Sequence, residues 1–117
     1  MARHEAWEDI PWEELTPSIK RRIVTGEKGM AAFVHLSKGA TVPAHKHESE
    51  QITYVVSGAL RFTMEDGSTI DVKSGETLVI PSNVEHAALA LEDTLDMDCF
   101  SPIREDYAEM MNNYIPT

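Results

Sequence analysis

The stretch that decides the fold runs from residue 39 to residue 58 and reads GATVPAHKHESEQITYVVSG. It places His45 and His47 two positions apart in an extended segment, so both imidazoles leave the same face of the chain. Gln51 follows four positions later and keeps the same parity as the next strand begins. Taken alone, the histidine pair has two interpretations: two metal ligands, or two partly exposed side chains in a loop.

A second stretch, residues 75–86, reads GETLVIPSNVEH and supplies His86 at the start of a later strand. Three imidazoles and the side-chain carbonyl oxygen of Gln51, brought together inside a barrel, would hold one divalent metal ion and leave positions open for water or substrate. Because these ligands are neutral, the ion would keep its +2 charge and act as a strong Lewis acid. Zinc, iron, manganese and nickel all suit this donor set. We expect His4 and His35 to lie outside the site.

Together the two stretches resemble the two sequence motifs of the cupin superfamily, in the usual order and spacing. The matching positions are Gly39, His45, His47, Gln51 and Gly58, followed by Gly75, Pro81, Asn83 and His86. Three positions depart from the usual pattern: Gln51 replaces a Glu, Asn83 replaces a Gly, and Ala90 replaces an Asn. None of them removes a ligand position, but Gln51 weakens any parallel with oxygenases that use a carboxylate there. The resemblance implies a small jelly-roll barrel, also called a double-stranded β-helix.

The rest of the chain predicts an all-β fold. Short runs rich in Val, Ile, Thr and aromatic residues recur about every ten residues, bounded by Gly, Pro or Asp. The predicted strands are 18–25, 30–36, 41–44, 51–57, 59–64, 69–72, 77–80, 85–91 and 94–100. We expect one domain over residues 1–117: an N-terminal arm (1–17), a barrel (18–101) and one short C-terminal helix (106–114).

Composition limits the partners of the protein. The chain has 117 residues, and 20 acidic against 10 basic residues give a formal net charge of −10. This charge argues against nucleic acid and anionic membranes as partners, and it requires local positive charge to hold any anionic ligand. One cysteine, Cys99, excludes an internal disulfide and suits a reducing compartment. The absence of an apolar leader at the N-terminus also favours the cytoplasm.

The alternation in residues 94–100 leaves two arrangements open. Asp96, Asp98 and Phe100 share one strand face, while Leu95, Met97 and Cys99 share the other. An ordinary amphipathic strand would bury the second set and expose the aspartates. A barrel with a polar interior and an outer packing layer would do the reverse. In either case Cys99 faces away from Asp98. In strand 85–91, the small side chains beside His86 favour a cavity next to the proposed ligands.

The sequence from Asp98 to Tyr107, DCFSPIREDY, gives a narrower resemblance, to the pectin degradation protein group of small cupins. This resemblance implies a metal-dependent enzyme that opens the ring of 4,5-unsaturated uronate monosaccharides from pectin or alginate. It also implies roles for three residues. Asp98 would be the general acid and base, Arg104 would bind the carboxylate of the anionic sugar, and Phe100 would form an apolar wall. The alternative is that Asp98 and Arg104 form only a surface ion pair.

Two other functions fit the predicted site. One is an iron- or manganese-dependent cupin oxygenase that acts on a small organic substrate, which the open coordination positions permit. The other is a non-catalytic cupin that binds a small ligand. Small cupins are usually dimers, and Trp7 and Trp12 in the arm are suited to cover an exposed sheet, so we expect a homodimer.

Overall fold

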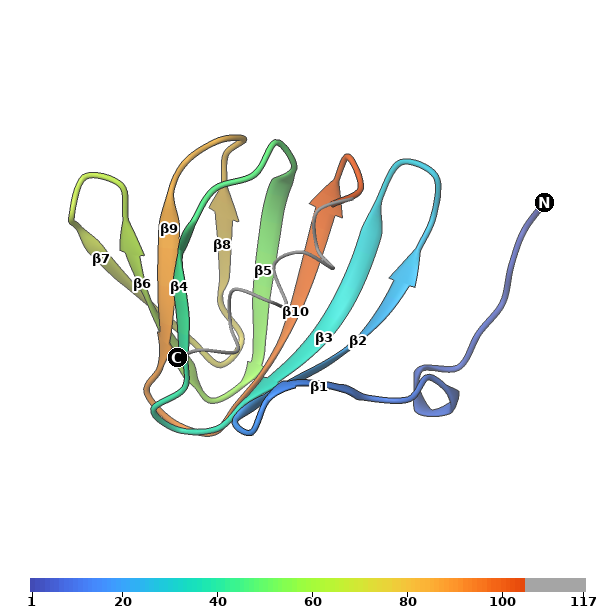
Figure 1. Cartoon of the computed structure of the whole chain (residues 1–117), viewed down its shortest axis with the longest axis horizontal. Coiled ribbons are helices and arrows are strands. Elements are labelled where there is room, and N and C mark those ends of the chain that lie inside the picture. Colours follow the sequence, from blue (N-terminus) through green and yellow to red (C-terminus); the bar gives the residue numbers. More distant parts are fainter. Residues whose placement is uncertain (105–117) are drawn as a thin grey trace.

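The computed structural model describes residues 1–104, so the predicted helix 106–114 lies outside the described residues. Within them, ten strands follow a single 3-10 turn at Trp7–Asp9 (Figure 1). The strands are β1 (Glu13–Thr16), β2 (Ile19–Thr25), β3 (Met30–Leu36), β4 (Thr41–His45), β5 (Glu50–Ser57), β6 (Ala59–Met64), β7 (Thr69–Lys73), β8 (Thr77–Ile80), β9 (His86–Ala90) and β10 (Thr94–Ser101). The predicted all-β fold is confirmed. The arm also contains β1, which the sequence pattern did not predict. No helix among residues 1–104 is long and apolar enough to cross a membrane.

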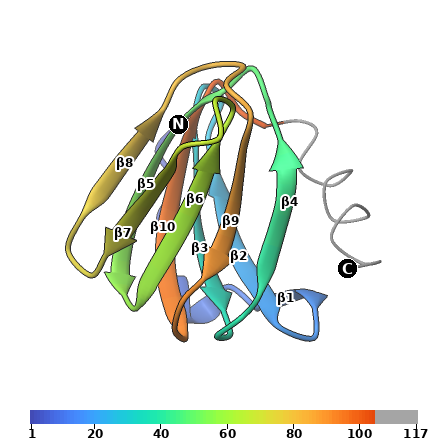
Figure 2. The ribbon, with the colours of Figure 1, turned by 90° about the vertical axis from the view of Figure 1, so that its left-hand side faces the viewer.

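The strands form two antiparallel sheets that face each other. One sheet has six strands in the order β1-β2-β3-β10-β5-β8, and the other has four in the order β4-β9-β6-β7. Figure 2 shows the four-stranded sheet in front of the six-stranded sheet, with the interior of the barrel between them. Strands far apart in sequence are neighbours: β10 lies between β3 and β5 in the larger sheet, and β9 lies between β4 and β6 in the smaller one.

Alternating burial along the central strands builds the core. In β3, every second residue from Met30 to Leu36 is buried, and β10 shows the same alternation from Thr94 to Phe100. Side chains from both sheets, among them Val34, Val55 and Leu60, meet in the apolar part of the interior.

Two turns depend on left-handed backbone conformations. Gly58 joins β5 to β6 at a φ of +94°, and a Cβ there would collide with the backbone of Asp93 and Thr94. Asn83 has a φ of +61°, a conformation that Asn adopts more readily than most residues. This turn lies three residues before His86 and sets the point where β9 begins.

Candidate metal centre and its cavity

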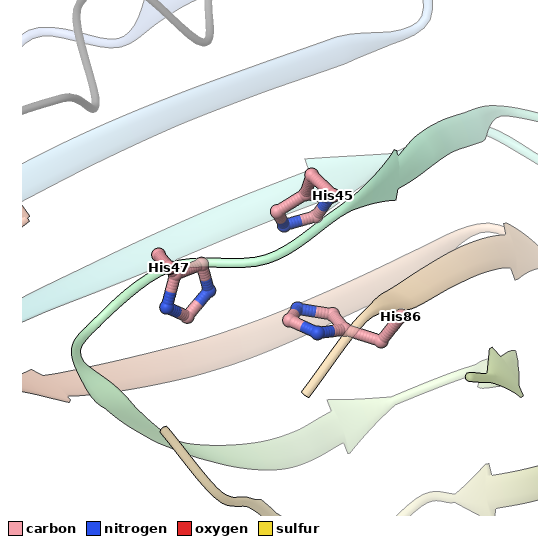
Figure 3. A group of neighbouring side chains, drawn as sticks. All are labelled: His45, His47 and His86. Atoms are coloured by element: carbon pink, nitrogen blue, oxygen red, sulfur yellow. The ribbon is translucent and has the colours of Figure 1, made fainter. Parts of the chain in front are cut away.

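Three histidines gather at one end of the barrel. His45 ends β4, His47 lies two residues later in the loop, and His86 opens β9 (Figure 3). Antiparallel pairing of β4 with β9 sets His45 opposite His86, and their ring centroids are 4.4 Å apart. One nitrogen from each ring lies within 4.8 Å of the others, so all three can reach a single ion.

Backbone carbonyls fix the orientation of each imidazole. The Nδ1 atoms of His45, His47 and His86 lie 2.8, 2.9 and 2.8 Å from the carbonyl oxygens of Pro43, Ser49 and Val84, respectively. Because a carbonyl oxygen only accepts, each Nδ1 carries the proton and each Nε2 carries a lone pair. The Nε2 atom of His86 is buried and has no hydrogen-bond partner among residues 1–104. This arrangement suits metal ligation, in which one ring nitrogen binds the ion and the other donates a hydrogen bond.

Gln51 adds a fourth donor beside the histidines. Its Oε1 lies 3.2 Å from Nε2 of His47, while its amide nitrogen donates to Oγ1 of Thr53 over 2.8 Å. The proton of His47 is on Nδ1, so Nε2 of His47 and Oε1 of Gln51 both present lone pairs. Two atoms with lone pairs lie this close at low cost only when a cation or a proton lies between them. The donor set of three imidazoles and one amide oxygen therefore fits a divalent metal ion.

Strand β10 supplies the acidic side of the cavity. Asp98 is only 8% exposed and accepts a hydrogen bond of 2.7 Å from the hydroxyl of Thr53. Asp96 is 3% exposed, whereas Met97 and Cys99 lie partly exposed on the outer face. Of the two arrangements that the sequence left open, the structure has the polar interior, and Cys99 faces away from Asp98.

Arg104 and Phe100 complete the site from the end of β10. Arg104 is 5% exposed, and its guanidinium lies 5.0 Å from the centroid of the Phe100 ring. That ring makes an edge-on contact with His47 at 5.7 Å between centroids. Arg104 is also close enough to the histidines for its charge to lower the pKa of all three. The alternative of a surface ion pair between Asp98 and Arg104 is inconsistent with this burial.

A single hollow connects these groups. Its empty space, counted out to the solvent, is about 520 Å³. His45, Gln51, His86, Asp98, Phe100 and Arg104 line it, and His47 adjoins it through the histidine cluster. Ala88 also lines the hollow, as expected for a small residue that leaves space. Thr53, which connects Gln51 to Asp98, was not predicted as a site residue, although it shares the parity of Gln51 along β5.

Comparison with known proteins gives the family. Residues 32–101 match the model of the cupin domain family. The chain is a cupin. The pectin degradation protein KdgF of Dickeya dadantii (strain 3937) is 36% identical to this cupin over 110 residues, which are 92% of this chain and 99% of KdgF.

Two solved structures are similar over nearly the whole of this cupin. The structure of KdgF from Halomonas sp. superposes with a TM-score of 0.84 at 35% identity, covering 92% of this chain and 99% of that one. An RmlC-like cupin from Shewanella frigidimarina superposes with a TM-score of 0.83 at 28% identity, covering 92% and 96%. The resemblance to the pectin degradation group is thus confirmed.

Burial keeps the three imidazoles of this cupin neutral. Desolvation lowers the pKa of His45 from 6.5 to about 4, and it also lowers the pKa values of His47 and His86. The neighbouring positive charge of Arg104 also lowers these three pKa values. At neutral pH all three Nε2 lone pairs are therefore available for a metal ion.

This neutrality predicts a weak pH dependence of zinc binding. Three ordinary imidazoles with a pKa of about 6.5 would lose about a thousandfold in affinity between about pH 7.5 and pH 5.5, as protons compete for the ligands. Because burial lowers these pKa values, we expect this cupin to lose far less over that range. A competition titration with a chelator of known pH dependence measures the difference, and a thousandfold loss would contradict the expectation.

Proposed function

We propose that this cupin is a metal-dependent enzyme that opens the ring of 4,5-unsaturated uronate monosaccharides, giving the linear 5-keto-4-deoxyuronate. The observation that carries this proposal is the meeting of a neutral metal-binding set, a buried carboxyl and a buried guanidinium in one hollow. The 36% identity to a pectin degradation protein supports the same substrate class.

In this proposal His45, His47, Gln51 and His86 hold one divalent ion, which is zinc, nickel, manganese or iron. When bound, the ion supplies Lewis acidity that polarises an oxygen of the substrate. The hydrogen bond from the Gln51 amide to Thr53 turns the amide oxygen toward the histidines. The residues of the chain therefore preset the coordination geometry before any ion binds.

The reaction rearranges bonds without adding or losing atoms. The hydroxyl on C1 loses its proton, the bond between C1 and the ring oxygen breaks, and C1 becomes an aldehyde. The bond electrons pass to the ring oxygen, which leaves an enolate at C4 and C5, and C4 then takes up a proton as C5 becomes a ketone. Asp98 is the acid and base in this scheme: it accepts the first proton and returns a proton to C4. The Phe100 ring forms an apolar wall beside the sugar.

Arg104 provides the positive charge that an anionic sugar requires in a protein of net charge −10. Its planar guanidinium can bind a carboxylate through two parallel hydrogen bonds, which the ammonium group of lysine cannot reproduce. Arg104→Lys is therefore expected to lower kcat/KM for the uronate by about 10- to 100-fold, mainly through a higher KM. Steady-state kinetics measure this effect. Arg61→Lys, at an exposed ion pair with Asp71, is the matched control and should change nothing; an unchanged KM in Arg104→Lys would contradict the role.

We also propose that the outer face of the six-stranded sheet joins two copies of the chain. Ile52, Tyr54 and Val79 on β5 and β8 form an exposed apolar patch there, with Val79 54% exposed. Light scattering should give twice the chain mass of 13.1 kDa for the wild type and the chain mass for Val79→Asp. Thr69→Asp, at an exposed position on β7 of the four-stranded sheet, is a control for added charge. A monomeric wild type would refute the dimer.

The single cysteine, which suits a reducing compartment, supports a cytoplasmic location.

The test of the proposed function is the loss of ultraviolet absorbance of a 4,5-unsaturated galacturonate on addition of the zinc-loaded protein. Turnover that is faster than the spontaneous reaction and proportional to bound metal supports the proposal. A fully metal-loaded protein without turnover would refute it. Oxygen consumption with a β-diketone or a flavonol would instead favour the oxygenase alternative.

A further inference from the structure

Thr53 connects two groups of the site that come from different strands. It lies on the inner face of β5, two residues after Gln51, and its cross-strand neighbour on β10 is Asp98. Its side chain is fully buried, at 0% exposure. The amide nitrogen of Gln51 donates to Oγ1 of Thr53 over 2.8 Å, and the Thr53 hydroxyl donates to Oδ1 of Asp98 over 2.7 Å. One hydroxyl group therefore contacts both a proposed metal ligand and the proposed acid and base.

These two hydrogen bonds have a fixed direction. A hydroxyl group carries one hydrogen and two lone pairs. Because the hydrogen of Thr53 goes to Asp98, Thr53 can only accept from Gln51, and the Gln51 side chain must turn its NH₂ group toward Thr53. The carbonyl oxygen of Gln51 then faces Nε2 of His47, 3.2 Å away. The orientation of the Gln51 amide thus follows from the acceptor at Asp98.

The reverse orientation of the Gln51 amide would block the histidine cluster. It would place the NH₂ group where Oε1 now lies, within reach of the lone pair on Nε2 of His47. A hydrogen bond there would occupy the nitrogen that a metal ion needs. The reversal would also set Oε1 against Oγ1 of Thr53, with no hydrogen between the two oxygens while Thr53 donates to Asp98. The contact with Thr53 therefore opposes the blocked orientation.

We propose that Thr53 is a positioning residue, whose hydroxyl keeps the oxygen of Gln51 turned toward the metal centre and holds Asp98 beside it. The inference rests on the proposed function for the identity of the metal ligands, whereas the hydrogen bonds belong to the chain itself. The direction of the bonds also accounts for Gln51 at a position where the cupin motif usually has Glu, because a carboxylate has no hydrogen to donate to Thr53.

The orientation of the amide is tested in the metal-free wild type by NMR. The side-chain NH₂ protons of Gln51 should show strong nuclear Overhauser effects to Thr53 and weak ones to the ring protons of His47. Gln51→Ala assigns these amide signals by their disappearance. The opposite pattern, strong to His47 and weak to Thr53, would overturn the proposal without the use of any Thr53 variant.

The consequence for metal binding is tested by chelator competition titration with zinc. Thr53→Ser keeps the hydroxyl and should bind zinc as the wild type does. Thr53→Val has the same shape without the hydroxyl, so the amide is free to reverse, and we expect about 10- to 100-fold weaker binding, as for other groups that orient a ligand. Thr94→Val is the matched control: it removes another buried hydroxyl, which bonds to the backbone of Ala59, and should leave zinc affinity unchanged.

A Gln51→Ala background separates positioning from a general effect on packing. This variant has no amide to orient, so adding Thr53→Val should cause no further loss of zinc affinity. Wild-type affinity in Thr53→Val, equally weak binding by Thr53→Ser, or the same loss in the Gln51→Ala background would each overturn the positioning role. The affinities are measured without substrate, so a protein that binds zinc but opens no uronate ring would refute only the proposed function.

Discussion

Replacing His86 with alanine is expected to remove most of the bound metal and, with it, the ring-opening activity. The Nε2 atom of His86 is buried without a hydrogen-bond partner among residues 1–104, and its Nδ1 is held by the carbonyl of Val84. The substitution would delete one of the four proposed ligands of a single ion. Loss of a group that merely orients a ligand typically costs about 10- to 100-fold in metal affinity, and we expect the loss of His86 itself to cost more.

The measurement is the metal content per chain after dialysis against zinc, followed by a chelator competition titration. His35→Ala is the matched control: His35 lies on β3, outside the histidine cluster, and its replacement should leave zinc affinity unchanged. Wild-type affinity in His86→Ala would contradict the assignment of the metal centre. A simple loss of folding is excluded if the variant unfolds at a temperature similar to that of the metal-free wild type.

The second large effect is expected at Asp98. Asp98→Asn keeps the size of the side chain and an oxygen that can accept from Thr53, but it cannot exchange a proton with the substrate. Because the proposed reaction both removes and returns a proton, we expect kcat to fall by about 10²- to 10⁴-fold. Metal content should stay at the wild-type level, since Asp98 is not a proposed ligand.

Kinetics with the 4,5-unsaturated galacturonate, normalised to bound zinc, measure this effect. Asp71→Asn, at an exposed carboxylate on β7, serves as the control and should retain full activity. Asp98→Asn with wild-type kcat would remove Asp98 from the mechanism. If Asp98→Asn is inactive only because it lacks zinc, then Asp98 contributes to metal binding and not to catalysis, which also contradicts the proposed role.

The sequence predicted the histidine cluster because its geometry follows from local rules. Alternation along an extended chain sets His45 and His47 on one face, and the two cupin motifs imply that His86 comes from a neighbouring strand. The structure shows that strand to be β9, paired with β4. The predicted strands likewise lie close to those observed, because turn residues mark their ends.

The acidic side of the hollow could not be settled in the same way. In β10 the inner face carries Asp96 and Asp98, and the outer face carries Leu95 and Met97, so hydrophobicity alone favours the wrong face. The inversion arises because the interior holds a polar site and the outer sheet face is itself apolar. The burial of Arg104 could not be predicted from the alternation of residues either. Arg104 follows the end of β10, so no strand periodicity determines the direction of its side chain.

The short strand β1 was missed for a similar reason. Pro11 and Pro17 lie on either side of it and favoured an irregular arm, yet the four residues Glu13–Thr16 pair with β2 and bury Leu15. This pairing is a tertiary interaction that the local sequence does not encode. Leu15 also lines the hollow, so the arm contributes to the wall of the site.

The most direct test of the proposed reaction is NMR of the product formed from a 4,5-unsaturated galacturonate in D₂O by the zinc-loaded protein. The expected product is the linear 5-keto-4-deoxyuronate with one deuteron at C4 in a single configuration, because Asp98 delivers it from one side of the bound sugar. Unchanged substrate, or a product deuterated equally in both configurations at the spontaneous rate, would contradict it.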